Sequence, residues 1–370
     1  MLRLKRPTAI ASVMLSLLVL SRSPGAALAQ ATTPAATPFS TVLGSAPNHG
    51  GTTIPYFADA FTYQGVSYPY TMVGTNPKTS TATTVVPTTI VPLRFVFADG
   101  TVLDGTDAVA ATVASPVFRK AAFLSGTTQY GDAIQRAMFW RYVAGTDYHV
   151  LLEQPRVLPA VTIVVPPTYG SVARAGDVLG YPAGQVGHAL GLVDATWFFS
   201  RYPGLVASTG VGATWLPILL SHNIGLYLGS PSGPCCVLGF HSVDPSGPLN
   251  GSGNQQVQTS VYASYDDPGA YLRFPGIQDV HALSHEVAEW LSDPFGTNPS
   301  PAWFSPLAPW YGCSRQLEVG DPLVGVAFVQ DGYHLQDEAF LSWFAREVPS
   351  TGILGRYTYL GTFAEPAPAC

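Results

Sequence analysis

The sequence His281-Ala-Leu-Ser-His285-Glu286-Val-Ala-Glu289-Trp290-Leu-Ser-Asp293-Pro294 places histidines and acids at helical spacing among apolar residues. Successive residues of an α-helix are rotated by about 100°, so residues four apart lie only about 40° apart on its surface. His281, His285 and Glu289 therefore form one stripe along the predicted helix. Glu286 lies at the edge of the same face, so two histidines and two acids point in similar directions.

This pattern is a variant of the H-E-x-x-H helix of zinc proteases. In that helix two histidines hold the zinc ion and the intervening glutamate moves protons. Here Glu289 stands in place of the second histidine, so we predict that His285 and Glu289 are metal ligands and that Glu286 is the general base. His281 and His285 also have H-x-x-x-H spacing, but Ala282 occupies the position of the base. His281 is therefore predicted to support a ligand or to be an alternative ligand.

A catalytic zinc ion needs three protein ligands and one open position. The segment Leu317-Glu-Val-Gly-Asp-Pro322 offers two downstream carboxylates. We assign Glu318 as the third ligand and Asp321 as the partner that orients His285, although the reverse assignment stays open. Glu338, on a helix predicted over residues 335–344, is the reserve ligand.

The remaining predictions at this site concern the substrate and the ion. Tyr333 is predicted to donate a hydrogen bond to the developing oxyanion, with His334 as the alternative donor. Zinc is the first choice of cofactor. Because Glu289 and Glu318 would both bring negative charge to the ion, manganese and calcium are alternatives.

The beginning of the chain has the features of a secretory signal. A basic stretch is followed by a short apolar run and by Ala27-Leu28-Ala29, so we predict a signal peptide over residues 1–29 and a flexible leader over residues 30–40. No later segment reaches about 18 uninterrupted apolar residues, which argues against a membrane span. We expect a protein that is secreted, either extracellular or periplasmic.

The charge of the chain bears on its partners. The whole sequence has a net charge of −6, and without residues 1–29, which contain four basic residues and no acid, the balance becomes 13 − 23 = −10. An acidic chain with only 11% charged residues gives no electrostatic reason to expect nucleic-acid binding. The sequence predicts no oligomeric state.

The four cysteines are Cys235, Cys236, Cys313 and Cys370, an even number in a predicted oxidising compartment. We expect two disulfides. A bond between the adjacent cysteines has unfavourable geometry, so two connectivities remain, in which Cys235 and Cys236 each pair with one of Cys313 and Cys370.

The pattern of short β-rich runs predicts an α+β fold. Residues 41–145 read as a small β-rich unit, with a hairpin turn at Ala98-Asp99-Gly100 and a helix near residues 129–140. Residues 146–370 read as a zincin-like domain of the metalloprotease type, in which a mixed sheet packs on the active-site helix. That helix is expected to begin after Pro275-Gly276, with Asp279 in its first turn, and to end at Asp293-Pro294.

Three segments carry a resemblance to a known family. The sequences Ser284-His-Glu-Val-Ala-Glu-Trp-Leu-Ser-Asp-Pro-Phe295, Ala302-Trp303 and Glu318-Val-Gly-Asp321 resemble the H-E-x-x-E, D/N-P, A-W and E-I-x-D series of the phosphate-induced protein 1 / EXORDIUM-like proteins of plants. Exported bacterial proteins of undefined function share the segment Gln-Tyr-Gly-Asp-Ala-Ile-Gln-Arg-Ala at residues 129–137. The resemblance covers residues 115–370 by segments.

The resemblance implies an exported protein linked to cell-wall growth, without an established reaction. The chain departs from the plant pattern in two places. His281 is an additional histidine, and Cys313 precedes Glu318, whereas the plant cysteine follows the aspartate. The disulfide pairing of the family is therefore not transferable to this chain.

Two functions follow from these residues. The first is a secreted, metal-dependent, peptidase-like hydrolase in which Glu286 acts as general base on a metal-bound water. The alternative is a non-catalytic extracellular protein that binds cell-wall polysaccharide or another polymer and keeps the acidic helix as a structural element. Tryptophans 290, 303, 310 and 343 with Tyr311 would line its binding groove, although such aromatic residues belong more often to the core.

Overall fold

The computed structural model describes residues 53–180, 182–244 and 257–370. The predicted signal peptide and leader, residues 1–29 and 30–40, lie outside the described residues. The described chain is mixed α+β, with many strands and few helices, which confirms the predicted class at that level. None of the helices in the described part of the chain is long and apolar enough to cross a membrane.

A seven-stranded sheet lies at the centre of the molecule, with strand order β10-β4-β15-β19-β18 and with β5 and β9 also pairing with β4. The strands of this sheet are β4 Thr88–Val96, β5 Val102–Asp104, β9 Arg156–Val157, β10 Val161–Val164, β15 Leu216–His222, β18 Gly239–Asp244 and β19 Gln258–Tyr265. β10, β4, β15 and β19 run parallel, whereas β18 is antiparallel to β19. β18 therefore forms one edge of the sheet.

Both faces of the central sheet are covered, which explains the nearly continuous apolar run of β15. Along β15, Ile218 and Leu220 point into one core cluster and Leu219 into another. The first cluster also contains Leu283 and Val287 of α6 His281–Ser292. The second contains side chains of α4 Ala195–Phe199 and α5 Tyr202–Ser208. The sheet thus separates α6 from these two short helices.

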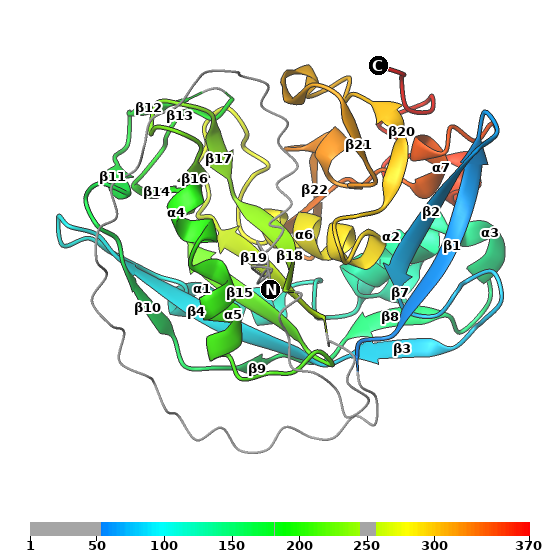
Figure 1. Cartoon of the computed structure of the whole chain (residues 1–370), viewed down its shortest axis with the longest axis horizontal. Helices are drawn as coiled ribbons and strands as arrows, with labels where there is room; N and C mark the ends of the chain where they lie inside the picture. Colours follow the sequence, from blue (N-terminus) through cyan, green and yellow to red (C-terminus); the bar gives the residue numbers. More distant parts are fainter. Residues whose placement is uncertain (1–52, 181, 245–256) are drawn as a thin grey trace, which may run out of the picture.

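The helix predicted from the opening stretch is present as α6 His281–Ser292, with Asp293 at its C-terminal end. Figure 1 shows α6 near the centre of the view, between β18 and β19 on one side and the C-terminal strands on the other. Asp279 precedes the helix rather than joining its first turn, with a φ of 44°. Its Oδ1 accepts hydrogen bonds from the backbone N–H groups of Val280 and His334.

α6 is also fixed by α2 Tyr130–Met138, the helix predicted near residues 129–140. A Cβ atom on Gly131 would lie 2.7 Å from Leu291 Cδ1, so a glycine permits the close approach of the two helices. On the sheet side, the indole N–H of Trp290 donates to Thr259 Oγ1 at 3.0 Å. These contacts hold the polar stripe of α6 in one orientation.

Four further strands form a second sheet in the order β11-β14-β16-β17. Their bounds are β11 Gly170–Ala173, β14 Leu190–Asp194, β16 Ile224–Tyr227 and β17 Cys235–Val237. The remaining strands form pairs, namely β1 Tyr56–Tyr63 with β2 Val66–Val73, β3 Thr83–Val86 with β8 His149–Leu152, β6 Ala121–Phe123 with β7 Gly126–Thr128, β12 Val178–Leu179 with β13 Gly184–Gln185, β20 Pro299–Trp303 with β21 Ser314–Gln316, and β22 Ala327–Gln330 with β23 Tyr333–Gln336.

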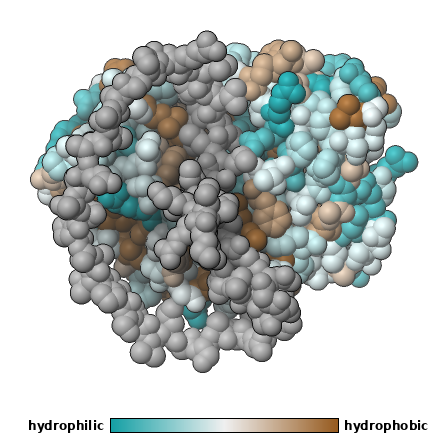
Figure 2. Space-filling view, viewed as in Figure 1, coloured by the Kyte–Doolittle hydropathy of each residue, from teal (hydrophilic) through white to brown (hydrophobic). Residues whose placement is uncertain are grey.

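The other helices are short. They are α1 Thr106–Ala114, α3 Trp140–Val143 and α7 Leu341–Phe344, with 3₁₀ turns at Pro309–Tyr311, Asp321–Leu323 and Ile353–Gly355. On the part of the surface drawn in colour in Figure 2, hydrophobic residues are interspersed with hydrophilic ones.

The predicted boundary near residue 145 does not coincide with a break in the central sheet. β4, from the predicted N-terminal unit, pairs in parallel with β15 of the predicted second domain. Phe57 and Met72 belong to the same core cluster as Trp343 and Phe344 near the C-terminus. The two segments therefore share a core.

The predicted disulfide pairing is wrong. The structure pairs Cys235 with Cys236, and Cys313 with Cys370. The prediction excluded adjacent cysteines because Cα atoms joined by a disulfide are usually further apart. Here the Cys235–Cys236 peptide bond is cis, and the two Cα atoms lie 3.0 Å apart.

The helix predicted over residues 335–344 is also mostly wrong. The first residues of this segment complete β23 Tyr333–Gln336, and only Leu341–Phe344 form a helix. The backbone N–H of Gln336 donates to Ser284 Oγ of α6 at 3.0 Å. Strand pairing and this contact with α6 replace the local helical bonds, so Glu338 lies between β23 and α7.

Candidate metal centre

The stripe of α6 and the segment after β21 bring three predicted residues together. His285 Nε2 lies 3.1 Å from Glu289 Oε2 and 3.9 Å from Asp321 Oδ1. One donor atom from each of these residues lies within 4.8 Å of the other two. In a tetrahedral zinc site with bonds of about 2.0–2.2 Å, neighbouring ligand atoms lie roughly 3–3.5 Å apart. A small contraction of this group would therefore let the three atoms bind one cation.

The segment Glu318-Val-Gly-Asp321 also orients Glu289. The backbone N–H groups of Gly320 and Asp321 donate to Glu289 Oε1 at 3.1 and 3.2 Å. These bonds leave Oε2 directed toward the histidines. A Cβ atom on Gly320 would lie 2.5 Å from His285 Nδ1, so the glycine is required for the approach of this segment to α6.

Glu286, the predicted base, is buried beside these candidate ligands. Its Oε1 lies 3.7 Å from His285 Nε2. Burial raises the pKa of Glu286, and the nearby Glu289 carboxylate adds to that effect, while His285 and His241 oppose it. A Cβ atom on Gly239 of β18 would lie 2.5 Å from Glu286 Cγ, so the backbone of this edge strand packs directly against the Glu286 side chain.

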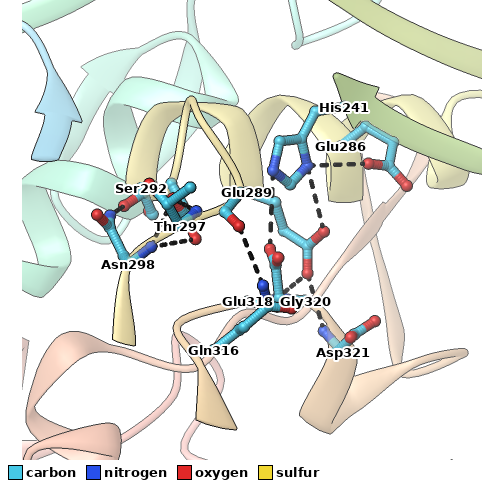
Figure 3. Close-up of polar contacts among 12 residues, drawn as sticks. His241, Glu286, Glu289, Ser292, Thr297, Asn298, Gln316, Glu318, Gly320 and Asp321 are labelled. Carbon is cyan, nitrogen blue, oxygen red and sulfur yellow. Dashed lines mark hydrogen bonds and ion pairs between the residues drawn. The ribbon is translucent and has the colours of Figure 1, made fainter. Parts of the chain in front are cut away.

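His241 of β18 belongs to the centre and was missed in the sequence. Its Nδ1 lies 3.6 Å from Glu286 Oε2 and 3.8 Å from Glu289 Oε2, and its Nε2 lies 3.8 Å from Glu318 Oε2 (Figure 3). Burial opposes the charged imidazolium, but the surrounding carboxylates outweigh burial and raise the pKa of His241 to about 10. The alternation of β18 could have indicated that His241 faces α6, but no motif spacing connects it to the helix.

Glu318, the predicted third ligand, lies beneath His241 rather than beside His285. It is fully buried, and neither of its carboxylate oxygens has a hydrogen-bond partner among the described residues. Burial, together with Glu289, raises the pKa of Glu318 well above its usual value. Asp321 therefore fits the third ligand position better, which is the reverse assignment that the sequence left open.

The structure places the other predicted residues around this centre. His281 is buried, its ring nitrogens have no hydrogen-bond partner among the described residues, and burial lowers its pKa to about 3. Glu338 Oε1 accepts a hydrogen bond from the hydroxyl of Tyr130 at 2.8 Å. Tyr333 is half-buried on β23 and is not among the residues that line the cavity described next.

His334, the alternative oxyanion donor, is held by another acid. Its Nδ1 lies 2.7 Å from Asp279 Oδ2, and its Nε2 lies 3.1 Å from Gln278 Nε2. The structure does not bring His334 into the group formed by His285, Glu289 and Asp321.

A cavity of about 120 Å³ adjoins the centre. His241, His285, Glu286, Glu289 and Asp321 line its polar end. Its apolar walls come from β17, β18 and the segment before α6, and they include Val237, Leu238, Phe240, Tyr271, Phe274, Ile277 and the Cys235–Cys236 disulfide. A ligand in this cavity would contact the acidic cluster at one end and apolar side chains elsewhere.

The residues of the centre fit a divalent cation. Glu286 Oε2 and both oxygens of Glu318 are buried and have no hydrogen-bond partner in the described part of the chain. Leaving a charged group buried without a partner is costly, so such atoms indicate either a bound cation or protonation. Imidazole combined with carboxylates suits zinc or manganese better than calcium, which prefers oxygen ligands alone.

Comparison of the chain with protein-family models, with curated proteins and with solved structures found no match. The resemblance to EXORDIUM-like proteins stays a prediction.

Proposed function

We propose that this protein is a secreted, metal-dependent hydrolase of the peptidase type with a zincin-like site. The observation that carries the proposal is the group formed by His285, Glu289 and Asp321, whose donor atoms lie within 4.8 Å of one another beside Glu286. This arrangement matches the layout of zinc peptidases. In that layout a histidine is followed one helical turn later by a second ligand, a glutamate lies between them, and a third ligand comes from downstream.

A bound zinc ion would supply a water molecule with a pKa lowered to about 7 and would polarise a carbonyl group. The protein residues then provide positioning and proton transfer. Glu289 Oε1 is fixed by the N–H groups of Gly320 and Asp321, which holds Oε2 at the ligand position. Glu286 accepts the proton of the attacking water and transfers it to the leaving amine. Its buried carboxyl, with a raised pKa, suits both transfers.

The edge strand supports a peptide as the substrate. β18 Gly239–Asp244 pairs with β19 on one side, and Gly239, Phe240 and His241 line the cavity. An extended peptide can add to a sheet edge through main-chain hydrogen bonds, with alternate side chains entering neighbouring pockets. This arrangement would bring a peptide carbonyl alongside α6.

Metal content and a single substitution test the proposal. The purified mature protein should contain zinc or manganese in stoichiometric amount by elemental analysis, and it should cleave a mixed peptide library. Glu286→Gln should keep the ion and lower the cleavage rate by about 10²-fold or more, because general base catalysis is lost. Glu365→Gln, at an exposed position, is the matched control. Absence of metal, or an unchanged rate in Glu286→Gln, would refute the proposal.

The burial of three tryptophans supports this function over the polymer-binding alternative. Trp290, Trp303 and Trp343 are buried in the core, so they offer no face on which a sugar could stack. Trp310 and Tyr311 are partly exposed, which leaves a small aromatic surface for such binding.

A further inference from the structure

The centre contains a second group of donor atoms, of which those of His241 and Glu286 are not used by the proposed catalytic cation. His241, Glu286 and Glu289 each offer one atom within 4.8 Å of the other two. His241 Nδ1 lies 3.6 Å from Glu286 Oε2 and 3.8 Å from Glu289 Oε2. This group shares only Glu289 with the group of His285 and Asp321. Figure 3 shows His241 next to Glu286 and Glu289.

Burial and missing partners distinguish this second group from an ordinary acidic cluster. His241, Glu286 and Glu289 are only 5%, 5% and 3% exposed. Glu286 Oε2, the atom directed at His241, has no hydrogen-bond partner among the described residues, and 3.6 Å is too long for a hydrogen bond. The separation instead leaves room for an ion between the two donors.

The charges of the centre support the same conclusion. Four carboxyl groups and two imidazoles meet here, from Glu286, Glu289, Glu318, Asp321, His241 and His285. Histidines that bind cations are neutral, so four carboxylates would be balanced by two divalent cations. With one cation, the remaining negative charge would have to be removed by protonation of Glu318 or offset by a protonated His241.

We propose that a second divalent transition-metal ion, such as zinc or manganese, binds between His241, Glu286 and Glu289. Glu289 then bridges the two cations. The effect of this second cation on activity rests on the proposed function. Glu286 serves as a ligand when the second cation is present and is then no longer able to accept a proton from water. Excess metal should therefore inhibit the hydrolase.

Binding stoichiometry tests the inference without reference to activity. Metal-free full-length mature protein is titrated with Zn²⁺, and separately with Mn²⁺, by calorimetry at constant pH. The wild type should bind two equivalents. His241→Gln and Asp321→Asn should each bind one, and Glu289→Gln should lose both. His188→Gln replaces a histidine outside both groups and should still bind two.

Folding is checked for each variant by circular dichroism, and His241→Asn is the second substitution if His241→Gln does not fold. Two equivalents in both folded His241 variants would overturn the assignment of His241, and so would loss of both equivalents. A wild type that binds one equivalent, and whose rate stays flat in excess zinc, would refute the second cation while leaving the proposed function intact. A wild type that binds none would refute both.

Discussion

Removal of the cation should destabilise the protein by an amount that can be calculated. An ion that binds only the native state stabilises it by RT ln(1 + [L]/Kd), or about 4 kcal/mol when the free ion is present at about 1,000 times Kd. At ~2.1 cal/mol/K per residue, the roughly 300 described residues give an unfolding entropy of ~0.6 kcal/mol/K. Chelation should therefore lower the melting temperature by about 6 °C.

The buried acids explain why removal of the cation should lower the stability of the folded protein. Without a cation, Glu286 Oε2 and both Glu318 oxygens are buried without a hydrogen-bond partner in the described part of the chain. Protonation of Glu318 relieves part of this cost, in agreement with its raised pKa. Glu318→Gln should thus change the stability of the metal-free protein by less than about 1 kcal/mol, because a neutral amide replaces a neutral acid.

The assay is thermal unfolding at pH 7, with and without a chelator, followed by the addition of excess Zn²⁺. Glu289→Gln should show no response to either treatment, since it lacks the shared ligand. Glu365→Gln, at an exposed position, should respond as the wild type does. If the wild type is shown to lose its metal and yet keeps its melting temperature, the cation does not stabilise the native state.

Three further outcomes follow from the structure. Gly320→Ala should weaken Zn²⁺ binding by at least 10-fold in calorimetry, because its Cβ would lie 2.5 Å from His285 Nδ1; unchanged affinity would contradict the close approach. Replacing both Cys313 and Cys370 by serine should cost about 2–4 kcal/mol in denaturant unfolding, since the bond closes a long loop with a sequence separation of 57; equal midpoints would argue against the pairing. Burial raises the pKa of Asp266 to about 7 in the folded protein. The contribution of the protonated acid to stability is therefore fully present below the pKa of the unfolded chain, and it is lost as the pH rises through 7. Asp266→Asn should therefore stabilise the protein by about 2–4 kcal/mol at pH 8 and by little at pH 4, and an equal effect at both pH values would contradict this origin.

The part of the site that lies on one helix could be predicted from the sequence. The i, i+4 relation of His285 and Glu289 is local, and α6 His281–Ser292 reproduces it. The nearly continuous apolar run of β15 similarly identifies a strand that is covered on both faces. In both cases the period of the pattern determines which side chains share a face.

The remaining residues of the site depend on tertiary contacts. His241 reaches α6 because β18 pairs with β19, and no periodicity within either segment encodes that pairing. The choice between Glu318 and Asp321 depends on how the segment after β21 packs against α6, because this packing places Asp321 near His285 and Glu318 near His241. The disulfides were mispredicted for a comparable reason, because a cis peptide bond at Cys235–Cys236 cannot be read from the residue types.

The position of Glu286 links the two proposals. Its Oε1 lies 3.7 Å from His285 Nε2, and its Oε2 lies 3.6 Å from His241 Nδ1, so one carboxylate faces both donor groups. A base must be able to accept a proton, whereas a ligand must keep its lone pairs on the ion. Under the two proposals, Glu286 would perform the first role only while the position beside His241 is empty of metal. The geometry that would place a base next to the proposed catalytic cation would therefore also make that base sensitive to a second cation.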